Sequence, residues 1–97
     1  MQYMKARLLA RTKEVRDDGA IVEVVIWSVP TPLRPSSHLF KYRLYCGRAG
    51  VDCVRYDNER GKGDHRHLNG QEFSYTFESI EQLLDDFEQD IKDWSAP

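Results

Sequence analysis

The sequence lacks a long apolar run, has few cysteines and contains none of the common nucleotide-binding motifs. No stretch approaches the ~20 apolar residues that a membrane-spanning helix needs. Charges interrupt residues 1–15 every few positions, so no secretory signal is expected, and two cysteines make no disulfide framework. A P-loop, a dinucleotide-binding glycine motif and a nucleophile elbow are also absent. We therefore expect a cytoplasmic protein with no membrane segment and no cofactor.

The chain is short and has ordinary globular composition. Its 97 residues are 40% hydrophobic and 31% charged, which argues against disorder. This length predicts a single domain over residues 1–97 and excludes an enzyme with separate cofactor and substrate domains.

The net charge of -2 hides an uneven distribution. Residues 78–97 hold seven acids and one base, whereas residues 1–77 hold thirteen bases and nine acids. A basic body suits a polyanionic partner such as RNA. The acidic segment is either the solvated face of a helix or a surface that docks a basic patch on a partner.

Six segments have the alternation or the β-branched content of strands. They are Tyr3–Arg11, Ala20–Val29, His38–Cys46, Val51–Asn58, Asp64–Leu68 and Glu72–Phe77. In the first, the period of two places Met4, Ala6, Leu8 and Ala10 on one face. The second is almost continuously apolar, which predicts a central strand covered on both faces.

Turn signals separate these strands. Gly19 ends an Asp-Asp-Gly turn, residues 47–50 predict a four-residue hairpin connection, and Asn69-Gly70 predicts a tight turn. Three prolines make residues 30–37 a loop, and residues 59–63 form a Gly-rich basic loop.

The last segment predicts a helix. Its apolar stripe at helical spacing is Ile80, Leu83, Leu84, Phe87, Ile91 and Trp94. Ser79 and Gln82 make a capping-box pattern at its start. The expected fold class is α+β: an antiparallel sheet of five or six strands with one C-terminal amphipathic helix packed on a face. An exposed edge strand could pair two subunits into a homodimer.

The segment Arg55–Leu68 is unusually rich in polar side chains that core packing does not need. It holds two of the three histidines, two glycines, two aspartates and four basic residues. If Asp64–Leu68 is extended, His65 and His67 point the same way and Arg66 points opposite. Three interpretations remain open: a metal site, acid–base catalysis, or ordinary loop and surface histidines.

A metal site would use the His-x-His pair, completed by His38, Asp57 or Asp64. No second ligand pair has recognisable spacing, so we expect no metal.

Acid–base catalysis needs one imidazole that takes a proton and one that gives a proton. This suits attack of an RNA 2′-hydroxyl on the adjacent phosphate. Lys62, Arg55 and Arg60 could hold that phosphate, and the backbone of residues 61–63 could form an anion nest.

Basic and aromatic residues also alternate outside this segment. Phe40, Lys41, Tyr42 and Arg43 are consecutive, and alternation predicts that the aromatic rings face the helix while the bases face water. That arrangement leaves a basic outer face compatible with RNA.

Cys46 and Cys53 are expected as buried thiols in a register that places Cys46 opposite Val51. A cysteine nucleophile paired with His65 or His67 is the catalytic alternative.

The segments that carry a family resemblance are AIVEVVIWSVP at 20–30, Ser37-His38, KYRL at 41–44, RYDNERGKGDHRH at 55–67 and a terminal amphipathic helix. Over nearly the whole chain, this pattern resembles the TumE-type toxins of prokaryotic toxin–antitoxin pairs. The most specific residues are Tyr56, Asp57, Asn58, Gly61, Lys62, His65 and His67. The resemblance implies a cytoplasmic toxin encoded beside an antitoxin that carries a DNA-binding domain. The chain lacks the helix-first order of RelE-like ribonuclease toxins, so their mechanism does not transfer directly.

We therefore expect a toxin that acts on RNA by metal-independent acid–base cleavage, with a non-catalytic RNA- or protein-binding regulator as the alternative. The predicted catalytic residues are His65, His67, Lys62, Asp57 and Asp64. The predicted substrate-binding residues are Arg55, Tyr56, Asn58, Arg60 and Arg66.

Overall fold

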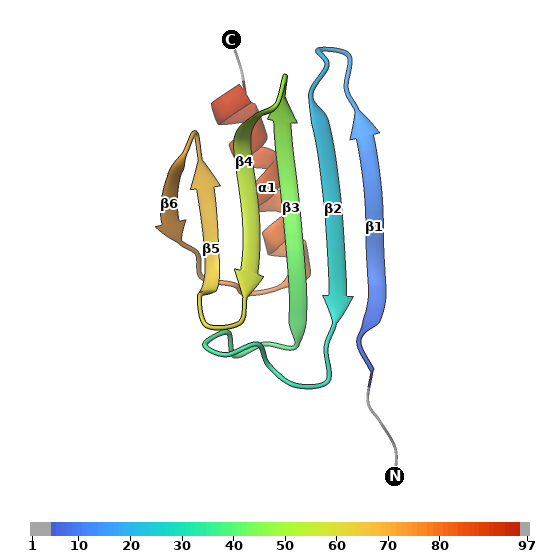
Figure 1. Cartoon of the computed structure of the whole chain (residues 1–97), viewed down its shortest axis with the longest axis vertical. Helices are drawn as coiled ribbons and strands as arrows, with labels where there is room; N and C mark the ends of the chain where they lie inside the picture. Colours follow the sequence, from blue (N-terminus) through green and yellow to red (C-terminus); the bar gives the residue numbers. More distant parts are fainter. Residues whose placement is uncertain (1–4, 96–97) are drawn as a thin grey trace.

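A computed structural model describes residues 5–95, with the backbone alone at positions 52, 94 and 95. It has six strands and one helix: β1 (Arg7–Val15), β2 (Ile21–Ser28), β3 (Phe40–Arg48), β4 (Val51–Glu59), β5 (Gly63–Leu68), β6 (Gln71–Ser74) and α1 (Ile80–Ser95). The strands form one antiparallel sheet in sequence order, with β1 and β6 at its edges (Figure 1). The expected α+β class is confirmed.

The helix covers one face of the sheet, mainly over β4, and leaves the other face open toward the viewer in Figure 1. Strand alternation sends every second side chain to the helix side. Leu44, Val54 and Tyr56 are fully buried there against Leu83 and Phe87 of α1. Burying an aliphatic or aromatic side chain of this size stabilises the fold by about 1.5–3 kcal/mol.

The predicted apolar stripe of α1 lies against the sheet, with Leu83, Phe87 and Ile91 buried and Ile80 and Leu84 packed around them. The side chain of Trp94, also in this stripe, lies outside the described residues. The predicted cap is confirmed because the Gln82 amide donates to Ser79 Oγ at 3.0 Å.

Strand β2 was expected to be covered on both faces, and this prediction is wrong. Val22 and Ile26 are buried on the helix side, whereas Glu23, Val25 and Trp27 lie half-buried on the open face. The apolar run therefore makes one core face and one partly exposed apolar surface.

Two registers also differ from expectation. A bulge between Leu8 and Ala10 puts these residues on opposite faces, because Leu8 pairs with Trp27 and Ala10 with Ile26. The predicted strand start at Tyr3 and the side chain of Met4 lie outside the described residues.

At the β3–β4 hairpin only Ala49 and Gly50 make the turn, both with positive φ, where a four-residue connection was predicted. An irregularity in the pairing then places Cys46 opposite Val54 and not Val51.

Candidate functional site

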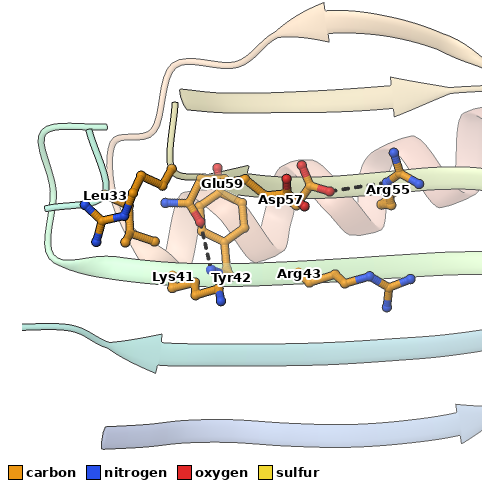
Figure 2. A pocket seen from close by; sticks show the side chains of 9 residues that line it. Leu33, Lys41, Tyr42, Arg43, Arg55, Asp57 and Glu59 are labelled. Atoms are coloured by element: carbon orange, nitrogen blue, oxygen red, sulfur yellow. Dashed lines mark hydrogen bonds and ion pairs between the residues drawn. The ribbon is translucent and has the colours of Figure 1, made fainter. Parts of the chain in front are cut away.

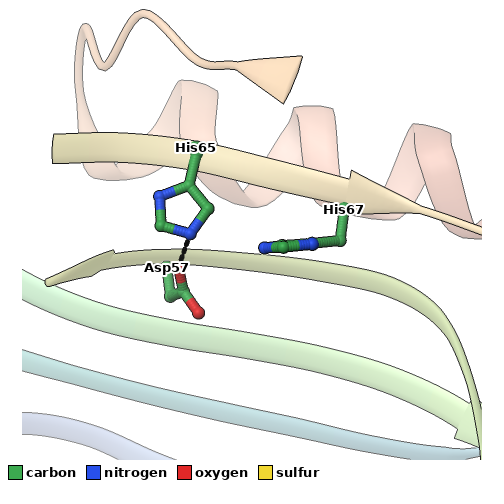
Figure 3. A group of neighbouring side chains, drawn as sticks. All are labelled: Asp57, His65 and His67. Carbon is green, nitrogen blue, oxygen red and sulfur yellow. Dashed lines mark ion pairs between the residues drawn. The ribbon is translucent and has the colours of Figure 1, made fainter. Parts of the chain in front are cut away.

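Strands β4 and β5 bring four of the predicted site residues together on the open face. Arg55 pairs with His67 across the ladder, and Asp57 pairs with His65. Antiparallel partners point to the same side of a sheet, so all four side chains meet opposite the helix. Figure 3 shows both imidazoles beside the Asp57 carboxylate. The prediction that His65 and His67 share one face and Arg66 takes the other is confirmed.

His65 is held at both ring nitrogens. Nδ1 lies 3.0 Å from the Gly63 carbonyl oxygen, which only accepts hydrogen bonds. Nε2 lies 2.6 Å from Asp57 Oδ1 and 3.4 Å from Glu72 Oε1. Each ring nitrogen thus faces an oxygen atom of a neighbouring residue. The side chain is only 9% exposed, and the Asp57 carboxylate is its closest polar neighbour.

His67 shares the Glu72 carboxylate, whose Oε1 lies 3.5 Å from its Nε2, but it has Arg55 as a further partner. Arg55 Nη2 donates to its Nε2 at 3.0 Å, and a guanidinium can only donate, so Nε2 carries a lone pair. Burial, and then the charge of Arg55, lower the pKa of His67 below its usual value. The rings of His65 and His67 meet edge to face with their centroids 5.1 Å apart. The two rings are therefore in contact but have different partners at their Nε2 atoms.

Asp57, His65 and His67 could also hold a metal ion, since their ligand atoms lie within 4.8 Å of one another. Asp57 Oδ1 is buried and lies outside hydrogen-bond geometry although it is close to His65. However, Arg55 occupies the Nε2 lone pair of His67 and lies 3.3 Å from Asp57 Oδ2. The guanidinium thus supplies the positive charge that a metal would bring, which favours proton chemistry over metal binding.

A hollow of about 600 Å³ opens beside this cluster, between β3 and β4 (Figure 2). Arg55 and Asp57 line it on β4, Lys41 and Arg43 line it on β3, and Arg60 lines it from the loop. The site residues predicted from the sequence did not include Lys41 and Arg43. The alternation of these bases with Tyr42 and Leu44 in the sequence did predict a basic outer face, which the structure has.

Lys62 lies at the β4–β5 turn and lines another hollow with His65 and Glu72. Its side chain is 66% exposed, and Nζ lies 3.9 Å from a Glu59 carboxylate oxygen. The predicted anion nest is not formed. The Gly61 amide donates to the Arg34 carbonyl at 2.7 Å, and the Lys62 amide donates to the Glu59 carbonyl at 3.0 Å.

Four predicted site residues, namely Tyr56, Asn58, Asp64 and Arg66, project to the helix side and do not join the histidines. Tyr56 donates its hydroxyl hydrogen to Asp90 of α1, and Arg66 Nη1 donates to the same carboxylate at 3.0 Å. Burial and the contact with Asp90 raise the pKa of Tyr56. This pair therefore anchors the helix to the sheet.

Asn58 and Asp64 fasten the loop before β3. Asn58 Oδ1 accepts from the Tyr42 amide at 2.9 Å. Asp64 accepts from Ser36 Oγ at 2.5 Å and Tyr42 Oη at 2.6 Å, and lies 2.7 Å from His38 Nε2. Asp64 thus orients His38, whereas Asp57 is the carboxylate beside His65.

Neither Cys46 nor Cys53 makes a described contact with His65 or His67. Cys46 is fully buried on the helix side, where burial raises the pKa of its thiol, and Cys53 is half-buried against the core. The expectation of buried thiols is therefore confirmed for Cys46 and holds in part for Cys53.

Fold and site together define a small α+β protein with one histidine–aspartate cluster on a basic, uncovered sheet face. The model of the family described as toxin TumE matches residues 5–95, and the chain belongs to that family. A search of curated proteins and a search of solved structures each gave no match. Membership gives the chain a toxin role and implies an antitoxin partner. Among the described residues, no helix is long and apolar enough to cross a membrane.

Proposed function

We propose that this toxin cleaves RNA without a metal, with one open-face histidine taking a proton from the RNA and the other giving a proton to it. The observation that carries the proposal is the contrast between the two rings, which lie 5.1 Å apart. His67 has a free-base lone pair and a lowered pKa, whereas His65 is enclosed by acceptors and paired with Asp57. Neighbouring titratable groups whose environments differ in this way are suited to act as base and acid.

In the proposed reaction His67 Nε2 takes the proton of an RNA 2′-hydroxyl. The 2′-oxygen then forms a bond to the neighbouring phosphorus, and the bond from phosphorus to the 5′-oxygen breaks. The leaving oxygen takes the place of the Asp57 carboxylate at His65 Nε2 and receives the Nε2 proton, while the Gly63 carbonyl holds the ring at Nδ1. The products are a 2′,3′-cyclic phosphate and a 5′-hydroxyl, and both transferred protons are accounted for.

Arg55 has two successive roles in this proposal. Without substrate it donates to His67 Nε2, and with substrate it turns to the phosphate and frees that lone pair. Lys41, Arg43 and Arg60 line the adjoining hollow and hold the flanking phosphates, with Lys62 on the other side of the cluster. The predicted site of action on cellular RNA is the cytoplasm.

The test is incubation of the purified chain with cellular RNA, with and without a chelator, beside His65→Ala and His67→Ala. Each variant should cleave about 10²- to 10⁴-fold more slowly, and the products should end in cyclic phosphates. His38→Gln is the matched control, because the third histidine lies on the helix side against Asp64. Cleavage that survives both substitutions overturns the assignment, and cleavage abolished by the chelator moves the chemistry to a metal.

A second candidate is a non-catalytic module that binds RNA or protein. The occupation of both His65 nitrogens favours it, because a ring so enclosed also fits a purely structural role. This candidate predicts growth arrest on expression together with intact RNA in the cleavage assay.

We also propose that the antitoxin carries a DNA-binding domain and docks on α1. Of the seven acids in residues 78–97, Asp86, Glu88 and Asp90 already contact the body of the toxin. Others, including Glu81 and Asp85, remain exposed and could meet a basic patch. Glu81→Lys with Asp85→Lys should then reduce co-purification with the product of a neighbouring gene, and unchanged co-purification would place the contact elsewhere.

A further inference from the structure

A smaller hollow of about 210 Å³ lies on the open face between β2 and β3, away from the histidines. Val25 and Trp27 line it from β2, and Lys41 and Arg43 line it from β3. Both bases also line the larger hollow beside Asp57, so the two hollows adjoin. An apolar recess with an indole therefore opens beside a cationic one.

The strand register connects this recess to the histidine pair. Trp27 is opposite Lys41, Val25 is opposite Arg43, Arg43 is opposite Asp57, and Asp57 is opposite His65. Neighbouring strands are about 4.8 Å apart, so the path from β2 to β5 is about 14 Å long. It crosses the strands in one direction on a face that the helix leaves open.

The charges along the path suit a phosphate backbone. Lys41 and Arg43 are exposed, and Arg11 and Lys13 extend the basic surface onto β1 by pairing with Val25 and Glu23. Of these, Arg43 has a nearby carboxylate, at 3.8 Å on Glu23. Cations beside an accessible aromatic ring form the usual platform for single-stranded nucleic acid, because phosphates meet the cations while a base stacks on the ring.

We propose that the hollow at Trp27 is a base-stacking subsite and that the substrate is single-stranded RNA lying across β2 to β5. This inference rests on the proposed RNA cleavage and specifies its substrate. The strand stacks one base on Trp27, crosses Lys41 and Arg43 through its phosphates and reaches the histidine pair. A duplex fits this path poorly, because its bases are already stacked and paired and cannot reach the indole.

The test is fluorescence anisotropy of a short labelled RNA whose 2′-hydroxyls are replaced by 2′-fluoro groups, so that it cannot be cleaved. The full-length protein should bind this single strand and bind the same strand much more weakly once it is annealed to its complement. Trp27→Ala should weaken single-strand binding about 5- to 150-fold, and Trp27→Phe should retain most of it. Val51→Ala is the control, because this apolar side chain is 64% exposed at the start of β4 and lines neither of the two adjoining hollows.

Since Trp27 is half-buried, Lys41→Glu is a second variant that changes only an exposed side chain, and it should also weaken binding. Equal affinity for strand and duplex, or wild-type affinity in folded Trp27→Ala, overturns the proposal. Binding of an acidic peptide such as polyglutamate as tightly as RNA also overturns the proposal.

The two proposals fail separately. If the single strand binds through Trp27 but natural RNA stays intact, the stacking subsite stands and cleavage falls. If natural strand and duplex are cleaved equally, cleavage stands and the stacking subsite falls.

Discussion

Substitution of Asp64 distinguishes most directly between a structural and a catalytic role for a predicted site residue. The sequence places it next to His65, but its carboxylate is on the helix side and is only 10% exposed. It accepts from Ser36 and Tyr42 and pairs with His38, and Phe77 stacks on the His38 ring at 3.9 Å. We predict that Asp64→Ala and Tyr42→Phe both lower the free energy of unfolding, and that Asp64→Ala lowers it more.

The expected magnitudes follow from the contacts. Tyr42 is 2% exposed, and burial together with its bond to Asp64 raises its pKa. Tyr42→Phe removes one hydrogen bond to a charged acceptor, worth about 1.5–3 kcal/mol. Asp64→Ala leaves the buried Tyr42 hydroxyl and two further groups without their acceptor, which costs about 3–5 kcal/mol. A domain of this size has a free energy of unfolding of about 5–15 kcal/mol, so the second variant approaches the limit of folding.

Urea denaturation followed by circular dichroism measures both effects. With a slope of about 1–3 kcal/mol per M, Tyr42→Phe should lower the midpoint by about 1 M and Asp64→Ala by about 2 M or more. The exposed Asp85→Asn should leave the midpoint nearly unchanged. An Asp64→Ala protein with the wild-type midpoint but no RNA cleavage would refute this reasoning and return Asp64 to the active site.

Three further predictions concern single groups. Ser79→Ala removes the acceptor for the Gln82 amide and should cost about 1 kcal/mol in the same urea assay. Burial raises the pKa of the Cys46 thiol, so a thiol reagent at pH 8 should label Cys53 in the native protein well before Cys46, and equal labelling rates would contradict the burial. Burial and Arg55 lower the pKa of His67, so the neutral base persists below pH ~6.5. Arg55→Gln should therefore move the acid limb of the pH–rate profile to higher pH. An unmoved limb would show that His67 is not the base.

The fold was predictable because its local signals agree with one another. Period-two alternation, Gly-containing turns and a capped apolar stripe each identify an element, and all six strands and the helix occur near their predicted positions. Alternation does not reveal bulges, which explains the two errors of register. The irregularity after Leu8 reverses the face of the residues that precede it, and the one at Cys46 changes its partner from Val51 to Val54.

The site was predictable in part, because its most distinctive residues are contiguous in sequence. His65 and His67 share a face by local geometry alone, whereas the choice between Asp57 and Asp64 as their partner depends on how β4 pairs with β5. That register places Asp57 opposite His65 and Asp64 opposite Asn58. The register between two strands depends on non-local contacts and cannot be read from the local pattern of one sequence.

The same register explains how one polar segment serves two purposes. On β4 and β5 the odd-numbered residues Arg55, Asp57, His65 and His67 form the open-face cluster, while the even-numbered residues Tyr56, Asn58, Asp64 and Arg66 fasten the helix and the loop. A one-residue slip between these strands would exchange the two sets, exposing a fully buried tyrosine and burying the arginine and histidines. The helix-side contacts thus hold the register that assembles the cluster. We therefore expect substitutions at Tyr56 or Asp90 to lower activity in proportion to lost folded protein, whereas those at His67 lower activity in a protein that remains folded.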